Sequence, residues 1–324
     1  MKLGVIVAIV LGLALATAIA AYVGFGALYA ALTHVGWRGL AALCGFSILP
    51  FTLLGTAWFL LAKNEALSRW PVFVWSRIVR DSAGELLPFS HLGGFVVGAR
   101  AAIERGLSPT TAFSTTVVDV TTELIAQLGF TAVGIGVLAV RLGAHSTHNA
   151  LVGSAVVGLV LTGVGAVAFI ALQRRGGDFI ERLIGRFIPG AATETAAVVD
   201  AIDAIYHSPA RIAGAIVVHL FAWVASAVGV WVALRAAGID VDLTGLLAIE
   251  SLVGAVRSAA FFVPGGIGVQ EATYVVLGRL FGLGPELFLA VSLLKRARDL
   301  TIGIPALLAW QGLEGLRLVE REKP

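Results

Sequence analysis

Long apolar runs separated by short polar stretches dominate this chain of 324 residues. A transmembrane helix needs about 20 mostly apolar residues. Stretches that meet this requirement predict spans at about 3–23, 37–62, 110–140, 150–172, 211–235, 243–263 and 285–312. The pattern therefore predicts an all-α, polytopic integral membrane protein, with about seven to eight transmembrane helices in a single domain over residues 1–324.

The distribution of lysine and arginine predicts how these spans are oriented. The first run follows Lys2 but is longer than the apolar core of about 7–15 residues in a signal peptide, so we interpret it as an uncleaved helix. Basic residues gather in the connections 63–80 and 174–208, whereas 141–149 and 236–242 hold few. Because positively charged loops remain in the cytoplasm, we expect both basic connections on the cytoplasmic side.

One part of the first basic connection has the pattern of a helix lying on the membrane surface. Residues 66–80 are too polar to span, and their apolar residues recur at helical spacing. Arg69, Arg77 and Arg80 fall on the opposite face. This arrangement predicts an interfacial helix whose arginines face water.

Two apolar, glycine-rich stretches, 84–106 and 260–283, are too charged to be ordinary spans. A shift of 176 residues aligns them without a gap and places Pro88 on Pro264. Each stretch is opened by a proline and is followed by a long apolar span that also begins with a proline. We interpret both as broken or re-entrant helices, because non-helical backbone at membrane depth survives only where it lines protein or a watery cavity.

The alignment predicts an internal repeat whose halves cover about 81–140 and 257–312. Paired interrupted helices in two halves point to the substrate site of a transporter. The predicted broken-helix elements are Pro88, His91, Gly93, Gly94, Pro264, Gly265, Gly266 and Gly268. Whether the halves are inverted or parallel is left open by the sequence.

The composition narrows the class of protein. Apolar residues make up 58% of the chain and charged residues only 13%, with a mean hydropathy of +0.93. Soluble domains carry about a quarter charged residues, so a soluble enzyme and a disordered chain are both excluded. The net charge of +3 comes from scattered groups and gives no sign of nucleic-acid binding. The single cysteine, Cys44, excludes an intramolecular disulfide and a multi-cysteine metal site.

Polar residues inside the predicted spans mark a candidate site. A charge at the bilayer centre costs ~2.5–3.5 kcal/mol on insertion scales, so it must face the protein interior or a cavity. The repeat places Asp119 on Lys295, and because their charges are opposite we expect the two groups to be coupled across the repeat interface. Such a pair, or a pair of Lys295 with Asp299, could be purely structural, or the charges could belong to a functional polar cavity. We expect the cavity, lined by Asp119, Glu123, Gln127, Arg257, Gln270, Glu271, Lys295, Arg298 and Asp299.

The indications of a functional role are weaker for the other candidate residues. His219 is alone in an apolar span and is interpreted as a packing residue, whereas His91 in the first broken stretch suits either role. Asp119 and Glu123 lack a third metal ligand, and no zinc motif or nucleophile elbow is present. None of the four lysines follows the glycine spacing of an ATP-binding loop. We therefore expect no metal, no cofactor and no nucleotide.

The signature Pro264-Gly265-Gly266-Ile267-Gly268-Val269-Gln270-Glu271 resembles the lysylphosphatidylglycerol synthase transmembrane family, also called flippase-like. A second element of that family, glycine-x-x-x-proline, is met at Gly84–Pro88. The amino-acid sequences of four further segments are most similar to those of the hopanoid-biosynthesis-associated branch of the family: 85–94, 118–121, 257–260 and 295–298.

The resemblance implies a multi-pass protein of the bacterial inner membrane that moves or hands over a lipid. Its partners would be a hopanoid, a phospholipid or a polyprenyl-type lipid, and lipid-biosynthesis enzymes. Only a short tail follows the last span, so we expect no aminoacyl-transfer domain and no enzyme activity. Arg257, Lys295 and Arg298 would face a polar or anionic head group. Two alternatives stay open: an intramembrane enzyme acting on lipid head groups, and a scaffold for hopanoid-synthesis enzymes.

Overall fold

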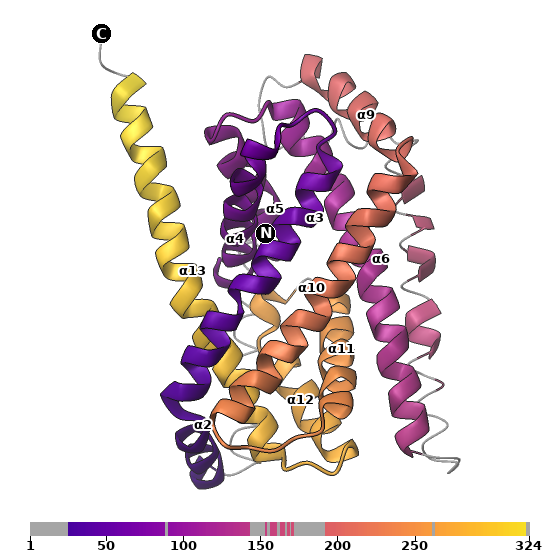
Figure 1. The fold of residues 1–324 in the computed structure, drawn as a ribbon, viewed down its shortest axis with the longest axis vertical. Coiled ribbons are helices and arrows are strands. Elements are labelled where there is room, and N and C mark those ends of the chain that lie inside the picture. Colours follow the sequence, from indigo (N-terminus) through magenta and orange to yellow (C-terminus); the bar gives the residue numbers. More distant parts are fainter. Residues whose placement is uncertain are drawn as a thin grey trace.

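The computed structural model describes residues 25–87, 90–142, 192–260 and 263–321, together with short helical pieces between 153 and 171. Every regular element in these ranges is a helix, which confirms the predicted all-α class (Figure 1). The predicted spans 3–23 and 150–172 lie wholly or largely outside the described residues, and so does Pro88.

The long helices correspond to predicted spans. In the part of the chain that the structure describes, three stretches are long and apolar enough to cross a membrane, namely Leu32–Leu61, Pro109–Arg141 and Pro209–Ala236. The helices, in chain order, are α2 (Phe25–Phe46), α3 (Ile48–Leu61), α4 (Trp70–Leu86), α5 (Ser90–Glu104), α6 (Pro109–Leu142), α9 (Ala192–Tyr206), α10 (Pro209–Ala236), α11 (Leu243–Ala259), α12 (Val269–Leu280) and α13 (Pro285–Arg321). Short 3₁₀ turns, Leu67–Arg69 and Pro264–Gly266, precede α4 and α12.

Hydrogen bonds between loops define two ends of the bundle. At the first end, the Arg211 guanidinium donates to the carbonyl oxygens of Leu60 and Lys63, so the start of α10 lies beside the end of α3. At the second end, Arg141 at the close of α6 pairs with Asp242 at the start of α11. The two connections predicted to be cytoplasmic therefore share one end, and the two poor in basic residues share the other.

The helices α4 and α5 form a hairpin that starts and finishes at the first end. The Arg69 guanidinium, just before α4, donates to the carbonyl oxygen of Arg105, just after α5 (2.8 Å). The hairpin of α11 and α12 instead starts and finishes at the second end, where the ring of Phe281 packs beside Gly245. Figure 1 shows the first hairpin in the upper half of the bundle and the second in the lower half.

The long helices that follow the hairpins run in opposite directions. Helix α6 leaves the first end and reaches Arg141 at the second, whereas α13 leaves the second end and carries Trp310 to Glu104 at the first. They lie on opposite flanks of the bundle (Figure 1). The two stretches that the repeat aligns, α4–α5–α6 and α11–α12–α13, therefore have inverted orientations, and this resolves the choice that the sequence left open.

The tip of each hairpin depends on glycine. Gly94 of α5 lies so close to α4 that a Cβ there would stand 2.7 Å from the Arg80 carbonyl oxygen and 2.9 Å from the Gly84 nitrogen. In the second hairpin, Gly265, Gly266 and Gly268 have φ values of +58°, +59° and +81°, a region that favours glycine. The glycines predicted as broken-helix elements thus provide close approach in one hairpin and a left-handed turn in the other.

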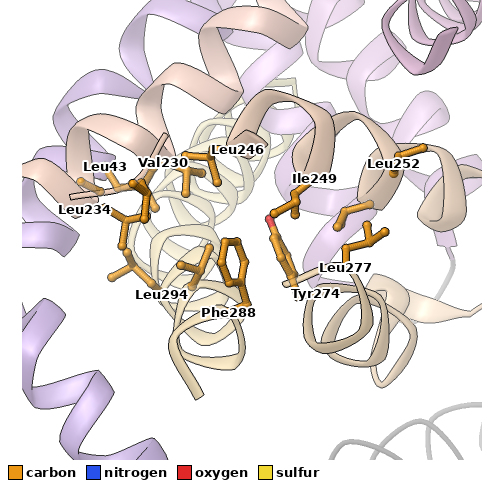
Figure 2. Packing of buried hydrophobic residues seen from close by; sticks show 14 of the residues in the cluster. Leu43, Val230, Leu234, Leu246, Ile249, Leu252, Tyr274, Leu277, Phe288 and Leu294 are labelled. Carbon is orange, nitrogen blue, oxygen red and sulfur yellow. The ribbon is translucent and has the colours of Figure 1, made fainter. Parts of the chain in front are cut away.

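Among the described residues, the largest apolar cluster joins α10, α11, α12 and α13, with contributions from α2 and α6. Figure 2 shows Tyr274 of α12 and Phe288 of α13 facing each other, with Leu246 and Ile249 of α11 above them. The two rings stack with centroids 6.1 Å apart, and both side chains are fully buried. This core fixes the second hairpin against α13 and so places the charged residues that the two elements carry.

The predicted interfacial helix at 66–80 is wrong. Residues from Trp70 onward belong to α4, which packs against α3, α5 and α13, and Arg77 and Arg80 are only 3% and 2% exposed. Helical spacing correctly placed Arg77 and Arg80 on one face of the helix, but that face turns to the protein interior. It does so because the carboxylates of Asp119 and Glu123 in α6 pair with the two arginines there.

Replacing Gly94 with alanine is expected to lower the free energy of unfolding by ~1–3 kcal/mol, because the added methyl group meets the α4 backbone. Gly129→Ala in α6 is the matched control, since a Cβ there meets nothing within 4 Å. Because alanine has a higher helix propensity than glycine, we expect Gly129→Ala to leave the free energy of unfolding unchanged or to raise it slightly. Thermal unfolding in detergent measures both variants. Equal midpoints for the two would contradict the close packing of the first hairpin.

Single cysteines at Ser68 and Asp240, in a Cys44→Ser background, should be labelled from opposite sides of the membrane. Ser68 lies at the first end and Asp240 at the second, and both are exposed. The positive-inside rule predicts that an impermeant thiol reagent on the non-cytoplasmic side of the membrane reaches only the cysteine at 240. Labelling of both positions from one side would refute the two-ended arrangement, and labelling of 68 alone would reverse its orientation.

Candidate functional site

A cavity of about 580 Å³ opens between the two hairpins and is lined by residues of α3, α4, α5, α6, α10, α11 and α13. Its volume is within the range of about 300–1,000 Å³ typical of small-molecule sites. One part of the lining is apolar and includes Phe51, Leu54, Phe95 and Phe130. The other part is charged, and its groups belong to three clusters.

The first cluster joins α4, α6 and α10. Arg77 donates through Nη1 to Asp119 (3.1 Å) and through Nη2 to Glu123 (2.5 Å). Arg80 bonds the same two carboxylates, at 2.5 and 2.9 Å. The Nε2 atom of His219 lies 3.0 Å from the second oxygen of Asp119, which is fully buried. Arg77 also pairs through Nε with Asp81 of its own helix (2.9 Å). Two arginines and three acids thus form one network, and His219 is part of it.

The second cluster joins α11, α12 and α13. The Lys295 ammonium donates to Glu250 (2.8 Å) and to the Tyr274 hydroxyl (2.9 Å), and that hydroxyl donates to the other oxygen of Glu250 (2.5 Å). All three groups are buried. The stacked ring of Tyr274 therefore also orients the lysine at the cavity wall.

The third cluster lies where the tips of the two hairpins meet. Arg257 of α11 donates through Nη2 to both carboxylate oxygens of Glu85 in α4, at 2.6 and 2.7 Å. Next to it in the lining, Arg298 of α13 pairs with its neighbour Asp299. The Glu85–Arg257 ion pair links the two inverted hairpins directly.

The charged lining is balanced and fully paired. Of the residues that the structure describes, five basic and five acidic side chains face the cavity, and each takes part in an ion pair. The lining charges are those of Arg77, Arg80, Asp81, Glu85, Glu123, Glu250, Arg257, Lys295, Arg298 and Asp299. Pairing of this kind is what allows charges to be buried in an apolar protein.

Comparison with known families agrees with a membrane protein. A sequence profile described as the lysylphosphatidylglycerol synthase TM region matches residues 5–306. The chain belongs to the lysylphosphatidylglycerol synthase transmembrane family. The resemblance seen in the signature residues is thereby confirmed at the level of the family. No curated protein and no solved structure matches the chain.

The structure gives the family signature at 264–271 a mechanical role. Glu271 accepts a hydrogen bond from the Gly268 amide (2.7 Å), which caps the start of α12, and it pairs with Arg296 of α13 (2.6 Å). Arg296 also donates to the Gly265 carbonyl oxygen (3.1 Å). The signature therefore builds the tip of the second hairpin and ties it to α13.

Most of the predicted cavity residues line one cavity in this member of the family. They are Glu123, Gln127, Arg257, Lys295, Arg298 and Asp299. Asp119 does not line the cavity but lies behind residues that do. Gln270 bonds Ser292, and Glu271 bonds Arg296, and neither pair belongs to the lining. Gly93 and Gly94 lie in α5. The backbone of His91 is in the first turn of α5, but the side chains of His91 and Pro264 lie outside the described residues.

The ion pair expected between Asp119 and Lys295 is wrong. Asp119 pairs with Arg77, Arg80 and His219, while Lys295 pairs with Glu250. Equivalent positions in inverted halves lie on separate helices at separate sides of the cavity, so opposite signs at such positions do not imply contact. The expectation for His219 also changes, because it packs in the interior but hydrogen-bonds the buried acid.

Several contributors to the charged lining were missed as site residues: Arg77, Arg80, Glu85, Glu250 and Tyr274. The available signal was charge balance. The predicted stripe of Asp119 and Glu123 required basic partners, and the nearest arginines in the aligned hairpin are in α4. Among the described residues, no three histidine, cysteine or acidic side chains are arranged to hold a metal ion.

Single substitutions Glu250→Gln and Lys295→Met should each lower the free energy of unfolding by ~3–5 kcal/mol, because each leaves its buried partner unpaired. The double variant should recover much of that loss. Asp119→Asn combined with Lys295→Met is the control, and its losses should add within ~0.5 kcal/mol, since the groups share no partner. Denaturant titration in detergent measures the free energy of unfolding for both double-mutant cycles. Additive losses for Glu250 and Lys295, together with non-additive losses for Asp119 and Lys295, would contradict the assigned ion pairs.

Proposed function

We propose that this protein carries the polar head of a membrane lipid across the hydrophobic interior, as a lipid translocase or a transport accessory of the bacterial inner membrane. The observation that carries the proposal is the paired, charged cavity between two hairpins that enter the bundle from opposite ends. A polar head group needs a polar place inside an otherwise apolar protein, and this cavity supplies one.

The two-part lining supports a lipid as the cargo. Its charged side can receive a head group, while Phe51, Leu54, Phe95 and Phe130 can contact hydrocarbon. Head and chain of one amphiphile would therefore find matching surfaces within a single cavity.

The inverted hairpins support movement of that cargo between the two membrane faces. Transporters with inverted repeats hold their substrate near the bilayer midplane and rock one repeat against the other. Here the Glu85–Arg257 ion pair stands at the contact between the two hairpins and in the cavity wall. It occupies the place where such rocking would act.

The cargo we propose is a hopanoid or another polar lipid, with phospholipid and polyprenyl-type lipids as the competing classes. The hopanoid proposal is supported by the similarity of residues 85–94 and 257–260 to the hopanoid-associated branch. The chain contains no ATP-binding loop, so movement would be passive or driven by an ion gradient.

An enzyme acting on head groups is the less well supported alternative. Acid–base chemistry would need a carboxylate free to exchange a proton with the substrate. The oxygens of Asp119 bond Arg77, Arg80 and His219, and both oxygens of Glu123 bond the two arginines. These contacts favour a structural role for both acids.

Reconstituted proteoliposomes test the proposal. Fluorescent analogues of a hopanoid, a phospholipid and a polyprenyl lipid are placed in the vesicles, and dithionite bleaching reports their exchange between leaflets. We expect accelerated exchange of at least one analogue. The double variant Glu85→Gln, Arg257→Gln should slow it by about tenfold, equivalent to ~1.4 kcal/mol in the barrier, because it removes the charged link without leaving a lone charge.

The matched control is Arg235→Gln with Asp240→Asn, an exposed ion pair at the second end of the bundle. It should leave the exchange rate unchanged. Exchange no faster than in protein-free vesicles for all three analogues would refute translocation. A change in lipid mass on incubation, lost in Asp119→Asn, would favour the enzyme instead.

A further inference from the structure

The head group that fits this cavity can be deduced from the polar atoms that have no partner. We infer that the cavity binds an uncharged head group rich in hydroxyls, in preference to an anionic or a zwitterionic one. This inference rests on the proposed function and specifies its substrate class.

Charge balance argues against an ionic head group. Each of the ten charged side chains in the lining already pairs with a partner of the opposite sign. A phosphate entering this cavity would lose its hydration and find no unpaired cation among the described lining residues. A zwitterion would lose the hydration of two charges. Desolvation of an ion is repaid only by good pairing, which here would require an existing pair to break.

The unpartnered atoms include donors. The indole Nε1 of Trp223 and the guanidinium Nε of Arg257 are buried, and neither bonds any atom among the described residues. Both side chains line the cavity, from α10 and α11 respectively. A buried donor without a partner is unfavourable by ~1–3 kcal/mol, so a ligand that accepts hydrogen bonds here is stabilised.

The unpartnered atoms also include an acceptor. The Nε2 of Gln127 donates to the Ser251 carbonyl oxygen (3.3 Å) and to the Thr131 hydroxyl (3.1 Å), and this fixes which amide atom is oxygen. Its Oε1 is buried and has no partner within the described part of the chain. Gln127 lines the same cavity, so the ligand must also donate.

The ligand must therefore both donate and accept hydrogen bonds without carrying a charge. Phosphate and carboxylate oxygens accept but do not donate, and an ammonium group donates but does not accept. A hydroxyl does both. A head group with several hydroxyls, such as a sugar or another polyol, can therefore satisfy Trp223, Arg257 and Gln127 together and leave every ion pair intact.

Three amphiphiles with the same octyl chain test this inference: octyl glucoside, octylphosphocholine and octyl phosphate. Each is titrated below its micellar concentration into the full-length protein in nanodiscs, with empty nanodiscs as the blank, and the heat of binding is measured. We expect the glucoside to bind about tenfold more tightly than either charged probe, a difference of ~1.4 kcal/mol.

Trp223→Phe isolates the contribution of one donor, because it removes the indole N–H and keeps an aromatic ring. It breaks no hydrogen bond among the described residues, so its thermal midpoint should match that of the parent. Glucoside binding should weaken about fivefold, the effect of a hydrogen bond of ~1 kcal/mol. Trp231→Phe is the control, since that indole donates to the Val241 carbonyl oxygen, and it should bind the glucoside as the parent does.

The possible outcomes distinguish failure of the uncharged-head-group inference from failure of the proposed lipid translocation. Equal or tighter binding of a charged probe overturns the uncharged head group, yet leaves a lipid cavity in place. Unchanged glucoside binding by Trp223→Phe also overturns the assigned contacts. If no probe binds while lipid exchange proceeds in proteoliposomes, the cavity is not the head-group site, and if exchange is absent as well, the proposed function fails with it.

Discussion

A charge inside an apolar protein must have a partner, and this constraint organises the whole bundle. Arg77 and Arg80 fix the position of α4 against the acids of α6, and Lys295 fixes α13 against Glu250 of α11. Apolar packing alone is not directional and would allow these helices to slide or rotate. The ion pairs are directional, so they select one register for each helix and bring the charged faces to a common cavity.

The family signature contributes to the same arrangement through its backbone. Left-handed glycines reverse the chain between α11 and α12, and Glu271 both caps the new helix and holds Arg296. The carbonyl oxygen of Glu85 lies 3.1 Å from the position of a Cβ on Gly265, so the tip packs closely against the first hairpin. Residues that look like binding residues in the sequence therefore act here by shaping the site that others line.

The sequence was informative wherever a pattern had one physical meaning. Apolar length predicted the spans at 37–62, 110–140 and 211–235. Polar residues on one face of α6 and α13 predicted five of the residues that line the cavity, and the repeat alignment added Arg257 of α11. Except for Arg257, each of these inferences depends only on neighbours along one helix.

The sequence failed where the meaning depended on another helix. The arginines of α4 were assigned to water because the acids that receive them lie some 40 residues later in the chain. Asp119 was paired with Lys295, although its partners are Arg77, Arg80 and His219. Sequence equivalence in a repeat carries no information on the relative orientation of its halves. The contact between α4 and α6 and the inverted orientation of the two halves are both visible only in three dimensions.

The buried arginines also constrain how the protein is made. On insertion scales each arginine costs ~2.5–3.5 kcal/mol at the centre of the bilayer, and α4 carries two. Arg77 has one acidic partner, Asp81, within α4 itself, whereas Asp119 and Glu123 belong to α6, which the ribosome delivers later. Among the described residues, Arg80 forms ion pairs only with those two acids of α6. Stable burial of Arg80 in the first hairpin therefore requires α6 to have been synthesised.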